Sequence, residues 1–297
     1  MSSEVKTIED VKDFWSKHPC GSQYSSNKDR KKYFEEVEAH RYKKIRSIKG
    51  IADFDQYAGK MVLEVGCGLG TDGRQFARDG AIYTGINLDE GSTFYAKDGF
   101  DLLEVKGTII QMNAEKMLFE NNTFDHIYSH GVIHHSPNTE QIVREMYRVL
   151  KPGGTINVMI YNRTSVNYYF EILFLRKIFR LLLFPKWAPS FFSKITGFDV
   201  AMLQRHREIM LGENMTKEKW IAINTDGPDC PIAKVYNENE ANKMFTDAGF
   251  KGMKNYVRYF NTEHYSFLGK LIPNSLADFI GNKAGWHRWI KANKPKE

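Results

Sequence analysis

The sequence is poor in cysteine and has no long hydrophobic run. Its three cysteines, Cys20, Cys67 and Cys230, lie far apart and outside any CxxC or Cys/His spacing, which argues against a disulfide framework and a zinc site. No stretch of about eighteen uncharged apolar residues occurs, so no membrane-spanning helix is expected. The N-terminal residues contain acids and no apolar core, unlike a signal peptide. We therefore expect a cytoplasmic protein with reduced thiols.

The chain has an excess of positive charge but no nucleic-acid motif. Its formal net charge is +6, and Lys and Arg concentrate in residues 28–46 and after residue 250. Acids interleave with the bases in the first of these segments, which is typical of a solvated helix face. Nucleic acid is therefore not an expected partner. Abundant apolar and aromatic residues exclude a disordered chain.

Strand and helix patterns alternate between residues 60 and 161. Apolar runs predict strands at 60–66, 81–88, 107–113, 124–131 and 155–161. Helices are expected near 68–80 and 139–150, with a turn at the KPGG of 151–154. This alternation predicts an α/β fold with a doubly wound, mainly parallel sheet. Helical spacing at 5–18 and 28–49 predicts helices before the sheet.

The alternation stops after residue 161. Residues 163–184 form a very apolar helical stretch that charged residues interrupt, and further helices are expected at about 187–211. The apolar stretch could lie on a membrane, dimerise, roof a site, or simply pack inside the domain. A strand at the AKVY of 233–236, a helix at 238–248 and a strand at 254–260 then follow. The tail from residue 263, which includes GWHRWIK, is expected to be helical.

The most informative segment is VLEVGCGLG, in which a strand leads into Gly66, Gly68 and Gly70. Glycine permits positive φ and a close approach of ligand to backbone, and the start of the following helix favours anionic groups. The spacing is GxGxG, Glu64 precedes the first glycine, and the next strand lacks the acid that a nicotinamide ribose needs. These details disfavour a dinucleotide site.

With NAEKMLFENNTFDHIYSHGVIHH and RVLKPGG, the EVGCGLGTD segment resembles the class I S-adenosylmethionine (SAM)-dependent methyltransferases. It is most similar to the small-molecule group related to ubiquinone and menaquinone biosynthesis, over about residues 60–161. The resemblance implies a Rossmann-like, seven-stranded sheet, SAM as cofactor, and methyl transfer to a small-molecule acceptor in biosynthetic or secondary metabolism. It leaves the oligomeric state open.

The resemblance also assigns roles to residues. Gly66–Gly70, with Cys67 as a small filler, would pass beneath SAM, Glu64 would support this loop, and Asp72 would cap the helix or meet the aminobutyrate group. Asn87 and Asn113 stand where the family usually has acids for the ribose and adenine, which puts those two contacts in question. The remaining cofactor-binding residues that we expect are Leu88, Ala114, Glu115, Ser129, Arg41 and Tyr33.

Three residues are candidates for catalysis. His130 and His134 follow the fourth strand, and Tyr161 ends the fifth. A histidine titrates near neutrality and could take a proton from the acceptor. For His134, a structural role as a hydrogen-bonded histidine is an equally good interpretation as catalysis. For Arg41, a plain ion pair is an equally good interpretation as cofactor binding.

The resulting organisation has five parts. They are an N-terminal helical lid at 1–50, a SAM-binding core at 51–161, a helical insertion at 162–215, the end of the core sheet at 216–262 and a helical tail at 263–297. Two other functions stay open. One is a SAM-consuming cyclase that forms azetidine-2-carboxylate and methylthioadenosine, and the other is a non-catalytic SAM-binding partner.

Overall fold

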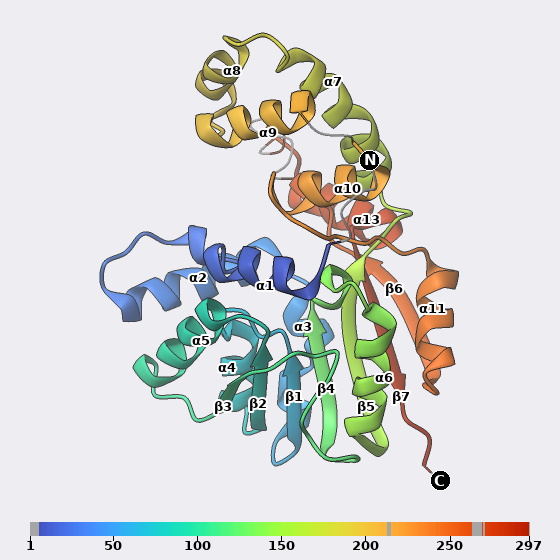
Figure 1. Cartoon of the computed structure of the whole chain (residues 1–297). Helices are drawn as coiled ribbons and strands as arrows, with labels where there is room; N and C mark the ends of the chain where they lie inside the picture. The colour runs from blue at the N-terminus through green and yellow to red at the C-terminus, as the bar shows by residue number, and fades with distance from the viewer. Residues whose placement is uncertain (1–5, 213–214, 263–268, 270, 297) are drawn as a thin grey trace. The chain divides into compact units, whose positions relative to one another are not determined.

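A computed structural model describes residues 6–212, 215–262, 269 and 271–296 of the chain (Figure 1). It divides into two compact units, each described separately below. Unit 1 comprises Met1–Ile160, Glu238–Asn255 and Trp289–Glu297, and unit 2 comprises Tyr161–Asn237 and Tyr256–Arg288. In these residues, no helix is both long and apolar enough to cross a membrane.

The predicted doubly wound, Rossmann-like sheet is confirmed. Its order is β3-β2-β1-β4-β5-β7-β6, and the pairs from β3 to β5 are parallel. The strands are β1 (Met61–Val65), β2 (Ile82–Asn87), β3 (Thr108–Gln111), β4 (Phe124–His130), β5 (Leu150–Tyr161), β6 (Lys251–Arg258) and β7 (His287–Asn293). Val62, Leu63 and Val65 of β1 are fully buried, as expected for a central strand covered on both faces.

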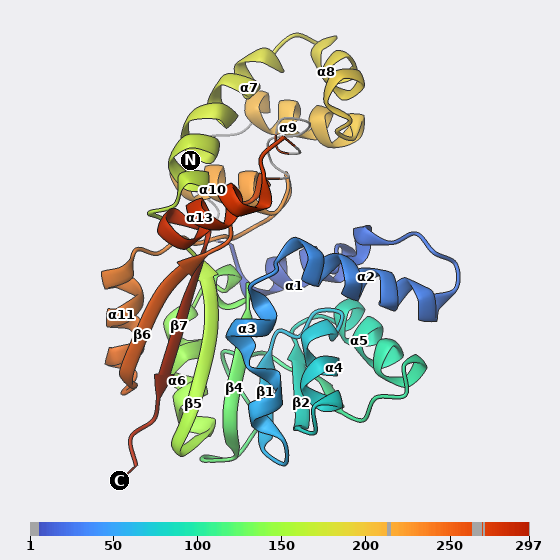
Figure 2. The same cartoon turned by 180° about the vertical axis from the view of Figure 1, so that it is seen from behind.

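The seventh strand comes from the tail, which corrects our prediction that the tail with GWHRWIK is helical. The tail contains helix α13 (Asn274–Ala284), but residues 287–293 form β7 between β5 and β6. Gly153 N–H donates to the Lys294 carbonyl, and Asn162 N–H donates to the Trp286 carbonyl. Residue numbers thus rise along β5 while they fall along β7, so the two strands are antiparallel. Figure 2 shows β7 beside β5 from behind.

Two further expectations are wrong because the tail enters the sheet. The KPGG of 151–154 is not a turn but the start of β5, because the chain near Lys294 pairs with Gly153 and Gly154. The AKVY of 233–236 is not a sheet strand. Only Tyr236 pairs there, in an isolated bridge to Asn162. The tail takes the position in the sheet that this segment was expected to fill.

The helices of unit 1 lie around the sheet, and each of them buries apolar side chains. They are α1 (Ile8–Lys17), α2 (Arg30–Lys44), α3 (Ile48–Ala52), α4 (Thr71–Arg78), α5 (Glu90–Leu102), α6 (Thr139–Val149) and α11 (Glu238–Asp247), with short 3-10 turns η1 (Ser22–Tyr24), η2 (Phe54–Tyr57) and η3 (Ile133–His135). α1 and α2 cross the edge at which β1, β2 and β4 end (Figures 1 and 2). The N-terminal helices thus lie at the edge where doubly wound folds bind ligands.

Unit 2 is mainly helical, as the break in alternation predicted. Its helices are the π-helical segment η4 (Asn167–Leu175), α7 (Arg176–Leu182), α8 (Ala188–Thr196), α9 (Val200–Gly212), α10 (Lys217–Thr225) and α13. The helical insertion before the last strands is therefore confirmed. Its apolar 163–184 stretch is not one regular α-helix, because η4 widens its first part before α7 begins.

Candidate functional site

The loop after β1 turns on three glycines with left-handed backbones. The φ angles of Gly66, Gly68 and Gly70 are +75°, +53° and +72°. A Cβ at Gly66 would lie 2.3 Å from Cγ1 of Val132, whereas a Cβ at Gly68 would meet no atom within 4 Å. Gly66 is thus required by packing, and Gly68 borders open space that a ligand can approach closely.

Asn87 braces this loop from the end of β2. Its Oδ1 accepts the Gly68 N–H at 2.8 Å, and its Nδ2 donates to the Gly68 carbonyl at 3.0 Å. A carboxylate could accept the first bond but could not donate the second. The asparagine that replaces the family's usual acid therefore binds both main-chain polar groups of Gly68, which belong to two successive peptide units. Leu88, the next residue, is half-buried.

Glu64 lies buried in β1 beside the loop. Its Oε2 accepts the Tyr83 hydroxyl at 2.5 Å, and burial, with the nearby charge of Asp72, raises its pKa. Cys67 is also buried, and burial raises the pKa of its thiol, so it is a poor nucleophile and fits the predicted filler. Tyr83 was missed at the sequence level. The sequence offers one signal, a glycine at position 73 inside a predicted helix. In the structure this glycine makes room for Tyr83, because a Cβ at Gly73 would lie 2.2 Å from the tyrosine ring.

Asp72 is the centre of a buried polar cluster. Arg41 binds its carboxylate with two N–H groups, Nε at 2.8 Å and Nη2, while the hydroxyls of Tyr128 and Tyr42 donate to it at 2.9 and 3.2 Å. Asp72 does not cap α4, whose N-cap is Gly70 without a side-chain bond. Arg41 is therefore fixed by Asp72 beside the glycine loop, with its Nη1 not used by that carboxylate. The role of Tyr128 was also missed.

The end of β4 carries Ser129 and His130. The Ser129 hydroxyl donates to the Val65 carbonyl at 2.8 Å, so it ties the ends of β4 and β1 together. The His130 ring lies 5.2 Å from the ring of Trp289 in β7. Burial, and secondarily the Arg41 charge, lowers the pKa of His130 well below its ordinary value. A neutral ring of this kind is a weak general base near neutral pH.

His134 and His135 are both buried in η3. Their ring centroids are 4.4 Å apart, and the Trp15 ring of α1 lies 5.1 Å from that of His135. α1 thus reaches the histidines that follow β4. A helix that covers the carboxyl edge of the sheet is expected to make such a contact.

The segment after β3 folds back toward η3. Asn113 Oδ1 accepts the Glu115 N–H at 2.8 Å, and Glu115 Oε1 accepts the Ser136 hydroxyl at 2.5 Å. Ala114, between them, is half-buried. Asn113 therefore acts as a turn residue, while one oxygen of Glu115 is not used by Ser136.

Tyr33 and Tyr161 lie in different units. Tyr33 packs in a buried cluster with Phe34 and Leu69, and its hydroxyl donates to the Ser22 carbonyl at 3.1 Å. Because Leu69 belongs to the loop, this cluster attaches α2 to it. In unit 2, the Tyr161 hydroxyl donates to Asp226 at 2.9 Å. Its catalytic role stays a prediction.

Comparison with known proteins gives the same family as the motifs. A methyltransferase domain family matches residues 63–158. The sterol 24-C-methyltransferase erg-4 of Neurospora crassa is 39% identical over 105 residues, which cover 33% of this chain and 26% of that protein. The ubiquinone biosynthesis O-methyltransferase of Acinetobacter baumannii is 27% identical over 181 residues, 57% of this chain and 74% of that one.

Residues 63–158 form a methyltransferase domain. Its matched segment spans about a quarter of the sterol methyltransferase. Among solved structures, the [4+2]-cyclase SpnF superimposes with a TM-score of 0.56 at 15% identity, over 99% of this chain and 98% of that one. At that identity, the likeness shows the fold alone.

The residues of this methyltransferase domain fit SAM, the family's cofactor. Open space borders Gly68, and the guanidinium of Arg41 lies next to the loop. An arginine suits the carboxylate of the ligand's amino-acid end. Asn87 is engaged with Gly68, so the ribose acceptor stays a prediction, for which Glu115 offers a carboxylate oxygen.

Proposed function

We propose that this chain transfers the methyl group of SAM to a small-molecule acceptor in biosynthetic or secondary metabolism. The observation that carries the proposal is the GxGxG loop after β1, whose Gly68 borders open space inside the matched domain. Relatives named for sterol, ubiquinone and phosphoethanolamine methylation support a small-molecule acceptor. We also propose a cytoplasmic location, where the exposed thiol of Cys20 would stay reduced.

SAM supplies a methyl group that is already activated by its positive sulfur, so the protein's main task is positioning. Alignment of reacting groups can contribute up to about 7–11 kcal/mol to lowering the barrier. Asn87 fixes the peptide at Gly68, and Asp72 fixes Arg41. α1 and α2 cover the ligand edge and exclude water, which is the lid role that we assign to residues 1–50.

Proton transfer has a smaller part in this proposal. Burial lowers the pKa of His130, so this residue is a weak candidate for a base near neutral pH. We propose that His134 accepts a proton when the acceptor carries one, and that His130 shapes the pocket with Trp289.

Calorimetric titration of the full chain with SAM and S-adenosylhomocysteine tests the ligand. Binding of both is expected, and Gly68→Ala should weaken it. Incubation with SAM alone tests the reaction: a methyltransferase leaves SAM intact without acceptor, whereas release of methylthioadenosine would favour the cyclase. Tight binding without turnover over a broad acceptor panel would favour the non-catalytic partner instead.

A further inference from the structure

Helix α7 of unit 2 buries one of its arginines and exposes several large apolar side chains. Arg180 is 3% exposed and Leu183 is 1% exposed, whereas Leu181 is 72% and Leu182 49% exposed. Residues at i, i+3 and i+4 share one face of a helix, so Ile178 lies on the same outer face as these two leucines. A helix in water normally shows the opposite arrangement.

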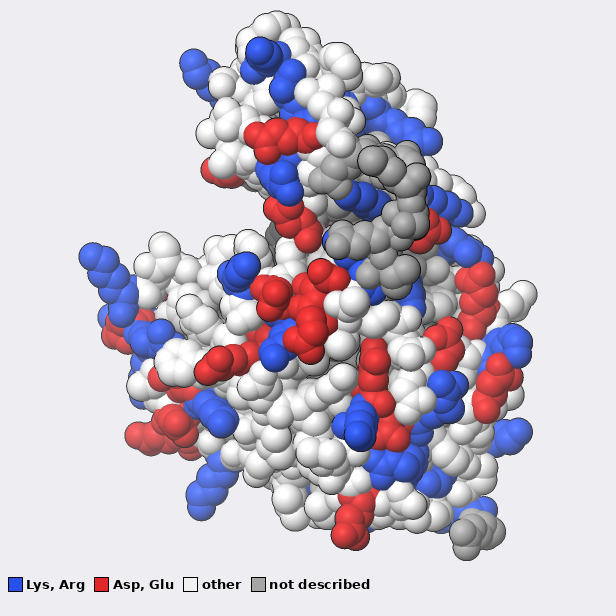
Figure 3. All heavy atoms as spheres, viewed as in Figure 1, with Lys and Arg blue, Asp and Glu red and all other residues white. Residues whose placement is uncertain are grey.

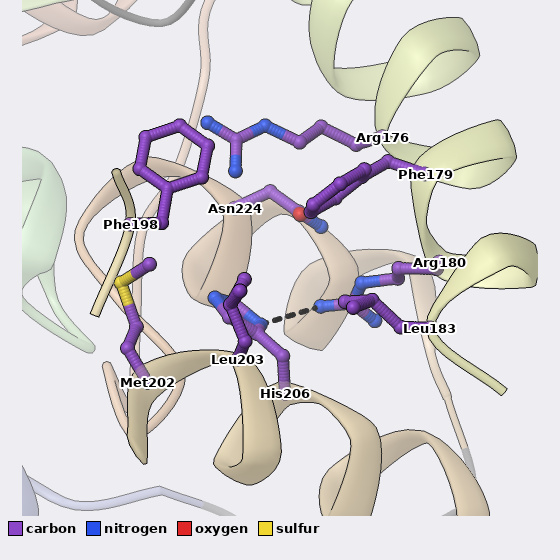
Figure 4. Close-up of a pocket in the computed structure, with 9 residues that line it drawn as sticks. All are labelled: Arg176, Phe179, Arg180, Leu183, Phe198, Met202, Leu203, His206 and Asn224. Carbon is purple, nitrogen blue, oxygen red and sulfur yellow. Dashed lines mark hydrogen bonds between the residues drawn. The ribbon is translucent and has the colours of Figure 1, made fainter. Parts of the chain in front are cut away.

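The structure explains how the inner face holds its arginine. Arg180 Nη2 donates to His206 Nδ1 at 3.2 Å, and the guanidinium lies 4.4 Å from the centroid of the Trp220 ring. Figure 4 shows Arg180 pointing toward His206 of α9 and Arg176 pointing toward Phe198, around a small cavity of about 10 Å³ that has room for one water. Arg180 and Arg176, the latter paired with Glu171, are therefore engaged within unit 2, whereas the exposed side chains of α7 are Lys177, Ile178, Leu181 and Leu182.

The outer face continues beyond α7. We define the α7–α8 apolar surface as Ile178, Leu181, Leu182, Phe184, Trp187 and Phe191, each between 43% and 72% exposed. Six large apolar side chains are thus exposed within fourteen residues, an accumulation of the kind that marks an interaction site.

Positive charge flanks this surface. Lys177, Lys186 and Lys194 are exposed, and Figure 3 shows Lys and Arg atoms beside uncharged surface over α7 and α8. In residues 170–200 the acids are Glu171, which is buried against Arg176, and the exposed Asp199. A partner that matches both features is apolar in its interior and negative at its surface.

We infer that the α7–α8 apolar surface docks on an anionic lipid bilayer and lies in its interface. No described helix could cross a membrane, which fits a segment that lies on the surface. The exposed Trp187 suits the interface between headgroups and acyl chains, and the three lysines suit anionic headgroups. A second copy would bring lysines against lysines. The inference goes beyond methyl transfer and does not depend on it.

Vesicle flotation with the full chain tests the inference. The protein should float with vesicles of equal parts phosphatidylcholine and phosphatidylglycerol, and much less with phosphatidylcholine alone. Leu181→Ser with Trp187→Ser should weaken binding at least tenfold, and Lys177→Gln about fivefold. Because these side chains are exposed, the variants should fold, which circular dichroism checks.

Matched controls are Leu118→Ser, which is 79% exposed in unit 1, and the exposed Lys254→Gln. Equal loss in these controls would overturn the inference, as would unchanged flotation of the double variant. If the protein did not float, and sedimentation velocity showed a dimer that the double variant converts to a monomer, the surface would bind a second copy instead. SAM titration of each variant separates a docking failure from a failure of the proposed function.

Discussion

Alanine substitutions at three glycines separate the packing role of the loop from its ligand role. Gly66, Gly68 and Gly59 all have left-handed backbones, with φ of +75°, +53° and +70°. Each alanine should therefore cost about 1–2 kcal/mol of unfolding free energy. Gly66→Ala adds a clash, because its Cβ would lie 2.3 Å from Val132, and overpacking costs a further ~1–3 kcal/mol. No atom lies within 4 Å of a Cβ at Gly68 or Gly59.

Urea unfolding and calorimetric SAM titration of the three variants give the assay. Gly66→Ala should lose about 2–5 kcal/mol of stability. Gly68→Ala and Gly59→Ala should lose similar, smaller amounts, but only Gly68→Ala should weaken SAM binding, by at least about tenfold or ~1.4 kcal/mol. If Gly68→Ala bound SAM as tightly as Gly59→Ala, the open space beside Gly68 would not be the ligand site.

Three other predictions follow from buried polar groups. Tyr83→Phe should cost about 1.5–3 kcal/mol in urea unfolding, since buried Glu64 loses its hydroxyl donor, and an unchanged midpoint would contradict this. Asp72→Asn should lower the unfolding free energy by about 3 kcal/mol, because the partly buried Arg41 loses its carboxylate partner. If a second change, Arg41→Leu, restored the unfolding free energy, the unpaired charge would be the cause. Burial lowers the pKa of His126 in the folded chain to about 3 from 6.5. On acidification, His126 is therefore protonated at a higher pH in the unfolded chain than in the folded chain. Unfolding free energy should fall by up to about 1.4 kcal/mol per pH unit between pH 6.5 and 3, and His126→Gln should flatten that slope in urea titrations at several pH values.

The sheet and the glycine loop could be predicted from the sequence because their signals are local. The five strands from β1 to β5 are apolar runs bounded by turns, and the strain of the loop requires glycine at fixed positions. The family resemblance gave the order of the motifs. Each of these signals can be read within about ten residues.

The errors involve partners that are distant in the chain. GWHRWIK has no strong strand pattern, and it becomes β7 because β5 and β6 leave a position between them. The predicted ligand contacts of Asn87 and Asp72 stay predictions, but their bonds to Gly68 and Arg41 could not be foreseen from the sequence. Arg41 lies 31 residues from Asp72, so no local pattern could reveal that pair.

The position of β7 has a consequence for synthesis. β6 is complete at Arg258, but it cannot join the other strands until residues 287–293 have left the ribosome and entered between it and β5. Until then, two neighbouring edges of the nascent sheet stand open, and His130 lacks its ring contact with Trp289. A premature stop before β7 would therefore release a chain with exposed strands that is prone to aggregate.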